Sequence, residues 1–161
     1  VMTTFPKRRV VSTRNVIIDW FYRGGLPEDA LITKNTETGT IRISNPLLTA
    51  ADLVQYQQHV GGLSRVATIL EELSEQIDIK SQFAPLATFV KKVVWQRLGY
   101  ILEHVVEENE LADELYEQIR NLPGSLMYMP LSTSAENNTS ERNRRWKINI
   151  NVQIEKDDSR C

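Results

Sequence analysis

The chain has 161 residues, of which 41% are hydrophobic and 25% are charged, as in an ordinary soluble single domain. Its formal net charge of −2 excludes a polycation built to coat nucleic acid. No apolar run approaches the roughly 20 residues of a membrane span, and no signal-peptide pattern opens the sequence. The single cysteine, Cys161, is the last residue, which excludes an internal disulfide framework and predicts a reducing, cytoplasmic setting.

The beginning of the chain is patterned for strands. Residues 8–12 and 15–22 are rich in Val, Ile and aromatic side chains, which fit a pleated surface. Gly24 and Gly25, followed by Pro27, predict the end of this pairing.

A second pair of strands is predicted directly afterwards, over residues 30–34 and 40–44. The polar residues 35–39 between them are typical of a hairpin loop. In the second strand Ile41 and Ile43 alternate with polar residues, so they share one face.

Helical patterning begins at Pro46 and ends before Pro123 and Gly124. The clearest period is an apolar stripe from 63 to 77, with glutamates outside it. We expect about five helices, and the third either continues into the fourth or breaks before it. They cover roughly residues 46–59, 63–77, 81–90, 94–105 and 109–122.

Short polar and glycine signals predict where these helices begin and end. Thr49 with Asp52 is close to a capping box, and Ser81 and Asn109 are predicted caps of later helices. Gly61-Gly62 is predicted to end the first helix, because glycine adopts the left-handed cap conformation without penalty.

The last part of the chain returns to a strand pattern. Residues 132–140 are rich in Ser, Asn and Thr and predict an exposed loop that is mobile or disordered. Residues 144–155 alternate, which predicts a half-buried strand. Its apolar face carries Trp146, Ile148, Ile150, Val152 and Ile154.

Together these elements predict a single domain of the α+β class. It comprises a strand-rich part (1–45), a helical part (46–122), a loop (123–143) and a final strand (144–155). Because both ends supply strands, the simplest architecture is a small, mostly antiparallel sheet formed from both chain ends and packed on a bundle of about five helices.

Charge is divided unevenly between these parts. Residues 1–45 contain seven basic and four acidic residues, whereas residues 46–120 contain six and twelve. Seven acidic residues and no Lys or Arg lie between Leu98 and Ile119. Two interpretations stay open, namely solvated helix faces or electrostatic steering of a basic partner.

Two basic clusters lie near the chain ends. If the end strands are neighbours, both clusters lie on one edge of the sheet. They either protect that edge from aggregation or contact nucleic acid or another partner, with nearby Trp and Tyr stacking on bases. The clusters are Lys7, Arg8 and Arg9 with Arg14, and Arg142, Arg144 and Arg145 with Lys147.

The sequence contains no recognisable catalytic constellation. His59 and His104 stand alone and are interpreted as structural or surface groups, because metal ligands need clustered spacing. The glycine pairs are too isolated for a phosphate loop, and no histidine lies near Cys161 to activate it. The acidic residues lie on polar helix faces, whereas catalytic carboxyl pairs need an apolar pocket. We therefore expect no enzyme, cofactor, metal or small-molecule substrate, with an enzyme built on scattered acids as the remaining alternative.

Three segments together resemble the carboxy-terminal domain of the AbiEi antitoxin family. They are 41–53 with the Gly-Gly-Leu-Ser of 61–64, Gln96–Glu103 with its Arg-Leu-Gly-Tyr, and the closing strand that begins at Trp146. The resemblance covers about residues 40–155. The motif residues are Ser44, Pro46, Asp52, Leu53, Gly61, Gly62, Arg97, Leu98, Gly99, Tyr100, Glu103, Trp146, Asn151 and Glu155.

The resemblance implies a function as well as a fold. AbiEi proteins are bacterial antitoxins and transcriptional autorepressors of abortive-infection systems that act in phage defence. They oppose a nucleotidyltransferase-like toxin without a stable complex. Full-length members resemble a winged helix-turn-helix reader of promoter DNA joined to this domain. No helical pattern precedes residue 47 here, so we expect the winged domain to be absent.

Most of these motif residues are expected to specify the fold. Gly99 in mid-helix costs about 1 kcal/mol relative to Ala, so we expect another helix to cross closely there. Arg97, Glu103 and Asn151 are interpreted as fold-specifying, or as also touching a partner. The leading hypothesis is a non-catalytic antitoxin domain in a bacterial cytoplasm, and the alternative is a nucleic-acid-binding or repressor-support module.

Overall fold

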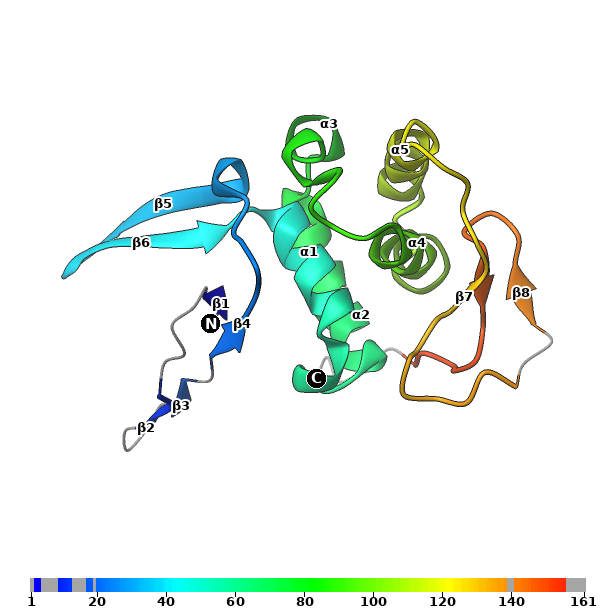
Figure 1. Ribbon diagram of the computed structural model, residues 1–161, viewed down its shortest axis with the longest axis horizontal. Coiled ribbons are helices and arrows are strands. Elements are labelled where there is room, and N and C mark those ends of the chain that lie inside the picture. Colours follow the sequence, from blue (N-terminus) through cyan, green and yellow to red (C-terminus); the bar gives the residue numbers. More distant parts are fainter. Residues whose placement is uncertain (1, 4–8, 13–16, 19, 139–140, 156–161) are drawn as a thin grey trace.

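The computed structural model describes residues 2–3, 9–12, 17–18, 20–138 and 141–155. It confirms the α+β class: helices occupy the middle of the molecule and small sheets lie on two sides of them (Figure 1). The helices are α1 (Pro46–Gln55), α2 (Leu63–Leu73), α3 (Ile79–Gln82), α4 (Lys92–Ile101) and α5 (Asn109–Arg120). The strands are β1 (Met2–Thr3), β2 (Val11–Ser12), β3 (Ile17–Ile18), β4 (Phe21–Tyr22), β5 (Leu31–Thr36), β6 (Gly39–Ser44), β7 (Met129–Pro130), β8 (Arg142–Asn143) and β9 (Ile148–Asn149).

The prediction that both chain ends share one sheet is wrong for the described residues. β1 pairs with β4, β2 with β3 and β5 with β6, while β9 lies between β7 and β8. Figure 1 shows β1–β6 on one side of the helices and β7 and β8 on the other. The alternation near the end of the chain specified an apolar face but not its partner, and Trp146 of that face packs on Gly99 of α4 and Tyr116 of α5.

The predicted final strand is also much shorter than expected. Only Ile148–Asn149 is strand, and the preceding residues 144–147 form a turn in which Lys147 has a φ of 53°. Trp146 therefore enters the core from a turn. The strand ends at Asn149, although the Ile150 N–H still donates to the Glu141 carbonyl at 2.9 Å, in register with the β8–β9 pair.

The predicted hairpin is confirmed in β5 and β6. The strands pair antiparallel from Leu31 with Ser44 to Thr36 with Gly39, so the loop contains two residues, not the expected five of 35–39. Farther towards the beginning, the two long strands predicted over 8–12 and 15–22 are short β2, β3 and β4 in the part that the structure describes.

The helix caps differ from those predicted. Asn45, not Thr49, caps α1, because its side-chain oxygen accepts the Leu48 N–H at 2.8 Å and Pro46 occupies the first turn. Asp78, one helical turn before the expected position, caps α3 by accepting the Ser81 N–H.

Two helix lengths and one cap also differ. The predicted first helix divides into α1 and a short 3-10 turn over Gln57–His59, and the third is the four-residue α3 followed by a 3-10 turn. Asn109 begins α5 but its side-chain amide donates to the Glu107 carbonyl, so it is not the predicted cap. Gly61 and Gly62 do end the first helical region, both with positive φ.

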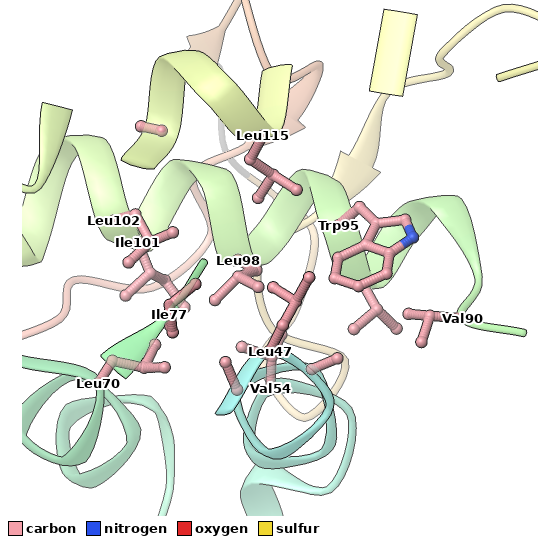
Figure 2. Close-up of a cluster of buried hydrophobic side chains, with 14 of the residues drawn as sticks. Leu47, Val54, Leu70, Ile77, Val90, Trp95, Leu98, Ile101, Leu102 and Leu115 are labelled. Carbon is pink, nitrogen blue, oxygen red and sulfur yellow. The ribbon is translucent and has the colours of Figure 1, made fainter. Parts of the chain in front are cut away.

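The hydrophobic core lies where α1, α2, α4 and α5 meet. Leu47, Val54, Leu70, Leu98 and Leu115 converge there and none exposes measurable surface (Figure 2). Burying a side chain of this size stabilises a fold by about 1.5–3 kcal/mol. α4 is the central helix, since seven of its ten residues are buried, two of them polar.

Candidate functional site

The two buried polar residues of α4 attach the last part of the chain to the helical body. Gln96 Nε2 donates to the carbonyl oxygens of Met127 at 2.9 Å and Trp146 at 2.8 Å. Arg97 Nε donates to the Pro130 carbonyl at 2.9 Å, and burial lowers the pKa of its guanidinium. Buried polar groups are costly unless they are hydrogen-bonded. These bonds therefore explain why polar residues are tolerated on the central helix.

Gly99 lies directly beneath the indole of Trp146. A Cβ atom built on Gly99 would lie 2.0 Å from Cζ3 of that ring, so no other residue fits. The expected helix crossing is thus wrong, and a side chain from the end of the chain fills the space. The indole Nε1 of Trp146 donates to a carboxylate oxygen of Glu103, and the Tyr116 ring packs edge-on at 5.3 Å.

Arg145, which precedes Trp146 in the same turn, adds charged contacts to this attachment. Arg145 bonds to Glu103 at 3.1 Å and Asp113 at 2.6 Å, and its guanidinium lies 4.6 Å from the Tyr116 ring centroid. Burial opposes the charge of Arg145, but the bonds to Asp113 and Glu103 outweigh it and raise the pKa of the guanidinium. Arg145 is therefore part of the attachment.

A π-helical turn over Leu102–Val106 carries the remaining contacts of α4. Asn143 accepts the Trp146 N–H at 2.8 Å through its side-chain oxygen, so its amide nitrogen faces Nε2 of His104 at 2.7 Å as donor. The His104 ring stacks on Tyr100 at 4.9 Å, and burial together with Glu141 raises the pKa of Tyr100. We call these contacts between α4, its π-helical turn and residues 126–151 the α4 clamp.

Comparison with protein families decides the classification. A family model described as the AbiEi antitoxin C-terminal domain matches residues 6–104. The chain belongs to this family. No curated protein and no solved structure matches this chain. The AbiEi match includes the first two motif segments and ends inside the π-helical turn, whereas Trp146, Asn151 and Glu155 lie beyond it.

The first AbiEi segment is stabilised by contacts of its own. Asp52 accepts bonds of 2.9 and 3.0 Å from Arg23, whose guanidinium lies 4.6 Å from the Phe89 ring centroid. Burial raises the pKa of Asp52, and the charge and hydrogen bond of Arg23 partly counteract this shift. Ser44 bonds through its hydroxyl to Thr49 at 2.7 Å. These AbiEi motif residues hold the hairpin and the loop after β4 on α1.

Asn151 holds the loop that follows β7. Its side-chain oxygen accepts the Ser132 N–H at 2.9 Å, and its nitrogen donates to the carbonyls of Ser132 and Ala135. Ser132 is buried, so the expectation of a wholly exposed loop over 132–140 is wrong at its start. The described part, 132–138, is anchored. Glu155 is exposed.

The second basic cluster divides by its contacts, since Arg142 and Lys147 lie over an aromatic ring and Arg145 pairs with carboxylates. Arg142 and Lys147 both face Tyr128, at 5.3 and 5.0 Å from its ring centroid. Met127 beside it is 72% exposed and Tyr128 is 38% exposed. We call Met127, Tyr128, Arg142, Arg144 and Lys147 the basic–aromatic patch. Arg145, in contrast, is held within the α4 clamp.

Only one residue of the first basic cluster, Arg9, lies within the described part of the chain. Lys7, Arg8 and Arg14 lie outside the described residues, and Arg9 is exposed beside β2. Because β2 and β8 belong to different sheets on different sides of the helices, the expectation that the clusters share one sheet edge is wrong for Arg9 (Figure 1).

Carboxylates do gather at one open pocket of about 350 Å³ between α3 and α5, where Glu108, Glu110 and Glu114 lie near Asp78 and Lys80. Lys80 pairs with Glu114 at 2.8 Å. The hydroxyl of Ser81 lowers the pKa of Asp78, which is the opposite of what a general acid requires. Within the described ranges, no group of three or more His, Cys, Asp or Glu side chains is placed to hold a metal ion. No helix in those ranges is long and apolar enough to cross a membrane.

Proposed function

We propose that this chain is a non-catalytic antitoxin domain that counteracts a nucleotidyltransferase-like toxin in the bacterial cytoplasm. The match to the AbiEi antitoxin C-terminal domain over residues 6–104 carries this proposal. The motif helix α4 supports it, because its polar residues bond within the fold and not into a cavity. In a longer protein that also contains a winged reader, the same domain would belong to a transcriptional autorepressor active in phage defence.

Growth rescue tests the antitoxin role. The chain is expressed together with the toxin encoded by the neighbouring gene, and we expect it to restore growth. A variant of the core, Leu98→Asp, serves as control, because a charge in the centre of the helices removes the fold. Soluble, folded wild-type chain that leaves the toxin fully active contradicts the proposal.

The mode of antagonism has its own readout. We propose functional antagonism without a stable complex, so the toxin should not co-purify with the chain even when growth is restored. A stoichiometric complex that survives gel filtration contradicts this mode, while leaving the antitoxin role intact.

A nucleic-acid-binding or repressor-support module is the second candidate. Its supporting observation is the positive charge of the exposed Arg142 and Arg144 and the half-buried Lys147. Phosphate contacts would make promoter binding fall steeply with salt. We expect the charge reversals Arg142→Glu and Arg144→Glu to flatten that salt dependence if this candidate is correct.

A further inference from the structure

The basic–aromatic patch contains positive charge that no carboxylate of the described residues neutralises. Among the residues that the structure describes, no carboxylate lies within ion-pair distance of Arg142, Arg144 or Lys147. Arg145, in the same turn, has two carboxylate partners. The neighbouring cations are therefore available to anionic groups of another molecule.

Apolar surface accompanies this charge. Met127 is the most exposed large hydrophobic residue in the described part of the chain, and Tyr128 lies next to it with Arg142 and Lys147 on its ring. Tyr, Met and Arg are enriched at protein–protein interfaces, where Tyr and Arg supply many of the strongest contacts. A thioether, in contrast, has little to offer a phosphate backbone.

The α4 clamp holds the patch in place. Gln96 bonds to the Met127 carbonyl, and the Lys147 carbonyl accepts the Met129 N–H at 3.0 Å. Lys147 keeps a φ of 53°, an unfavourable backbone conformation for a residue with a side chain. Side chains positioned before binding lose less conformational entropy on association, which favours affinity.

The charge of the rest of the molecule distinguishes between anionic partners. Residues 46–120 carry twelve acidic and six basic residues, which would repel an extended polyanion such as duplex DNA. Tight duplex binding commonly uses about 6–10 phosphate contacts, whereas the patch offers three cations. A short acidic segment matches the patch in both size and charge.

We propose that the basic–aromatic patch binds an acidic segment of a protein partner. Carboxylates of that segment pair with Arg142, Arg144 and Lys147, and an apolar side chain packs on Met127 and the edge of Tyr128. The antitoxin role does not assign a partner to this surface. The result of the growth-rescue experiment therefore neither supports nor contradicts this proposal.

Fluorescence anisotropy of the full chain tests the proposal at physiological salt. One probe is a labelled peptide in which glutamates flank a single leucine, and the others are a single-stranded RNA and a duplex DNA of equal formal charge. We expect the peptide to bind most tightly, and the double variant Arg142→Glu, Arg144→Glu to weaken it at least about tenfold, as for loss of paired interface charges. Arg65→Glu, an exposed cation on α2, is the matched control and should stay within about twofold of wild type.

The aromatic contribution has a separate test. Tyr128→Ala should weaken peptide binding and Tyr128→Phe should restore it, which a purely electrostatic attraction would not produce. Since these side chains are exposed, the melting temperature should be unchanged, and Arg142→Gln replaces the double variant if that variant unfolds. Tighter binding of either nucleic acid than of the peptide, or peptide binding that is unaffected by the charge reversals, overturns the proposal.

Discussion

At the scale of single residues, the fold requires a glycine at position 99, although glycine has a low helix propensity. Glycine within a helix is disfavoured by about 1 kcal/mol relative to alanine. Here the missing Cβ makes room for the indole of Trp146, whose Nε1 then reaches Glu103. The motif residues Gly99 and Trp146 therefore contact each other directly.

Gly99→Ala should lower the free energy of unfolding by about 1–3 kcal/mol, the usual cost of overpacking a core. The destabilisation arises because the added methyl group would overlap the Trp146 ring, and it overrides the better helix propensity of alanine. Urea denaturation followed by tryptophan fluorescence measures it. Gly24→Ala is the control, because nothing lies within 4 Å of the added atom there. Equal or greater stability of Gly99→Ala would show that the ring does not occupy this space.

At the scale of elements, Arg23 joins three parts of the chain. It lies after β4, bonds to Asp52 on α1 and stacks on Phe89 before α4. Its charge partly counteracts the burial that raises the pKa of Asp52. The pKa of Asp52 therefore depends on whether Arg23, in the loop after β4, is packed against α1.

Arg23→Met should raise the pKa of Asp52 further above its ordinary value of 3.8, because burial then acts without an opposing positive charge. In the pH range between 3.8 and the new value, the folded state binds more protons than the unfolded state. Stability contributed by this carboxyl must then fall as pH rises through that range. NMR titration of the Asp52 carboxyl and urea denaturation across the same range measure both effects. Arg65→Met controls for removal of a cation, and a lowered Asp52 pKa in Arg23→Met would refute the assignment.

At the scale of the whole molecule, the family match and the folded unit have different extents. The match ends at residue 104, but Leu131, Trp146 and Ile148 from the later chain are completely buried. The later part of the chain, with β7 and β8, lies beside α4 and α5 on the side opposite β1–β6 (Figure 1). The helical core is therefore complete only with the final segment.

A chain that ends at residue 125 should not fold cooperatively. It loses three completely buried large side chains, worth roughly 5–9 kcal/mol together, against a total stability of about 5–15 kcal/mol for a typical domain. It also leaves Gln96 and Arg97 buried without their carbonyl partners. Thermal denaturation followed by circular dichroism tests this, with Met127→Ala in the full chain as the exposed control. A truncated chain with a sharp, unshifted transition would disprove it.

How much of the candidate site was predictable depended on the distance between partners in the sequence. The Gly99 and Trp146 motifs were both recognised, but their contact was not, because no local pattern states which distant side chain fills a missing Cβ. The basic cluster at 142–147 was likewise recognised as one group. Arg145 bonds to Glu103 and Asp113, whereas Arg142 and Lys147 lie over Tyr128, and this division depends on residues far away in the chain.

The sequence by itself determined the family, the α+β class, the apolar stripe of α2, the glycine stop at Gly61-Gly62 and the β5–β6 hairpin. Each of these depends on side-chain period, turn chemistry or a motif within a short segment. Only the tertiary structure decided that β9 pairs with β7 and β8, and that β1–β6 lie on the opposite side of the helices from β7 and β8 (Figure 1). The physical reason is that an alternating pattern specifies which face of a strand is buried, whereas the buried surface that receives it is assembled from residues distant in the chain.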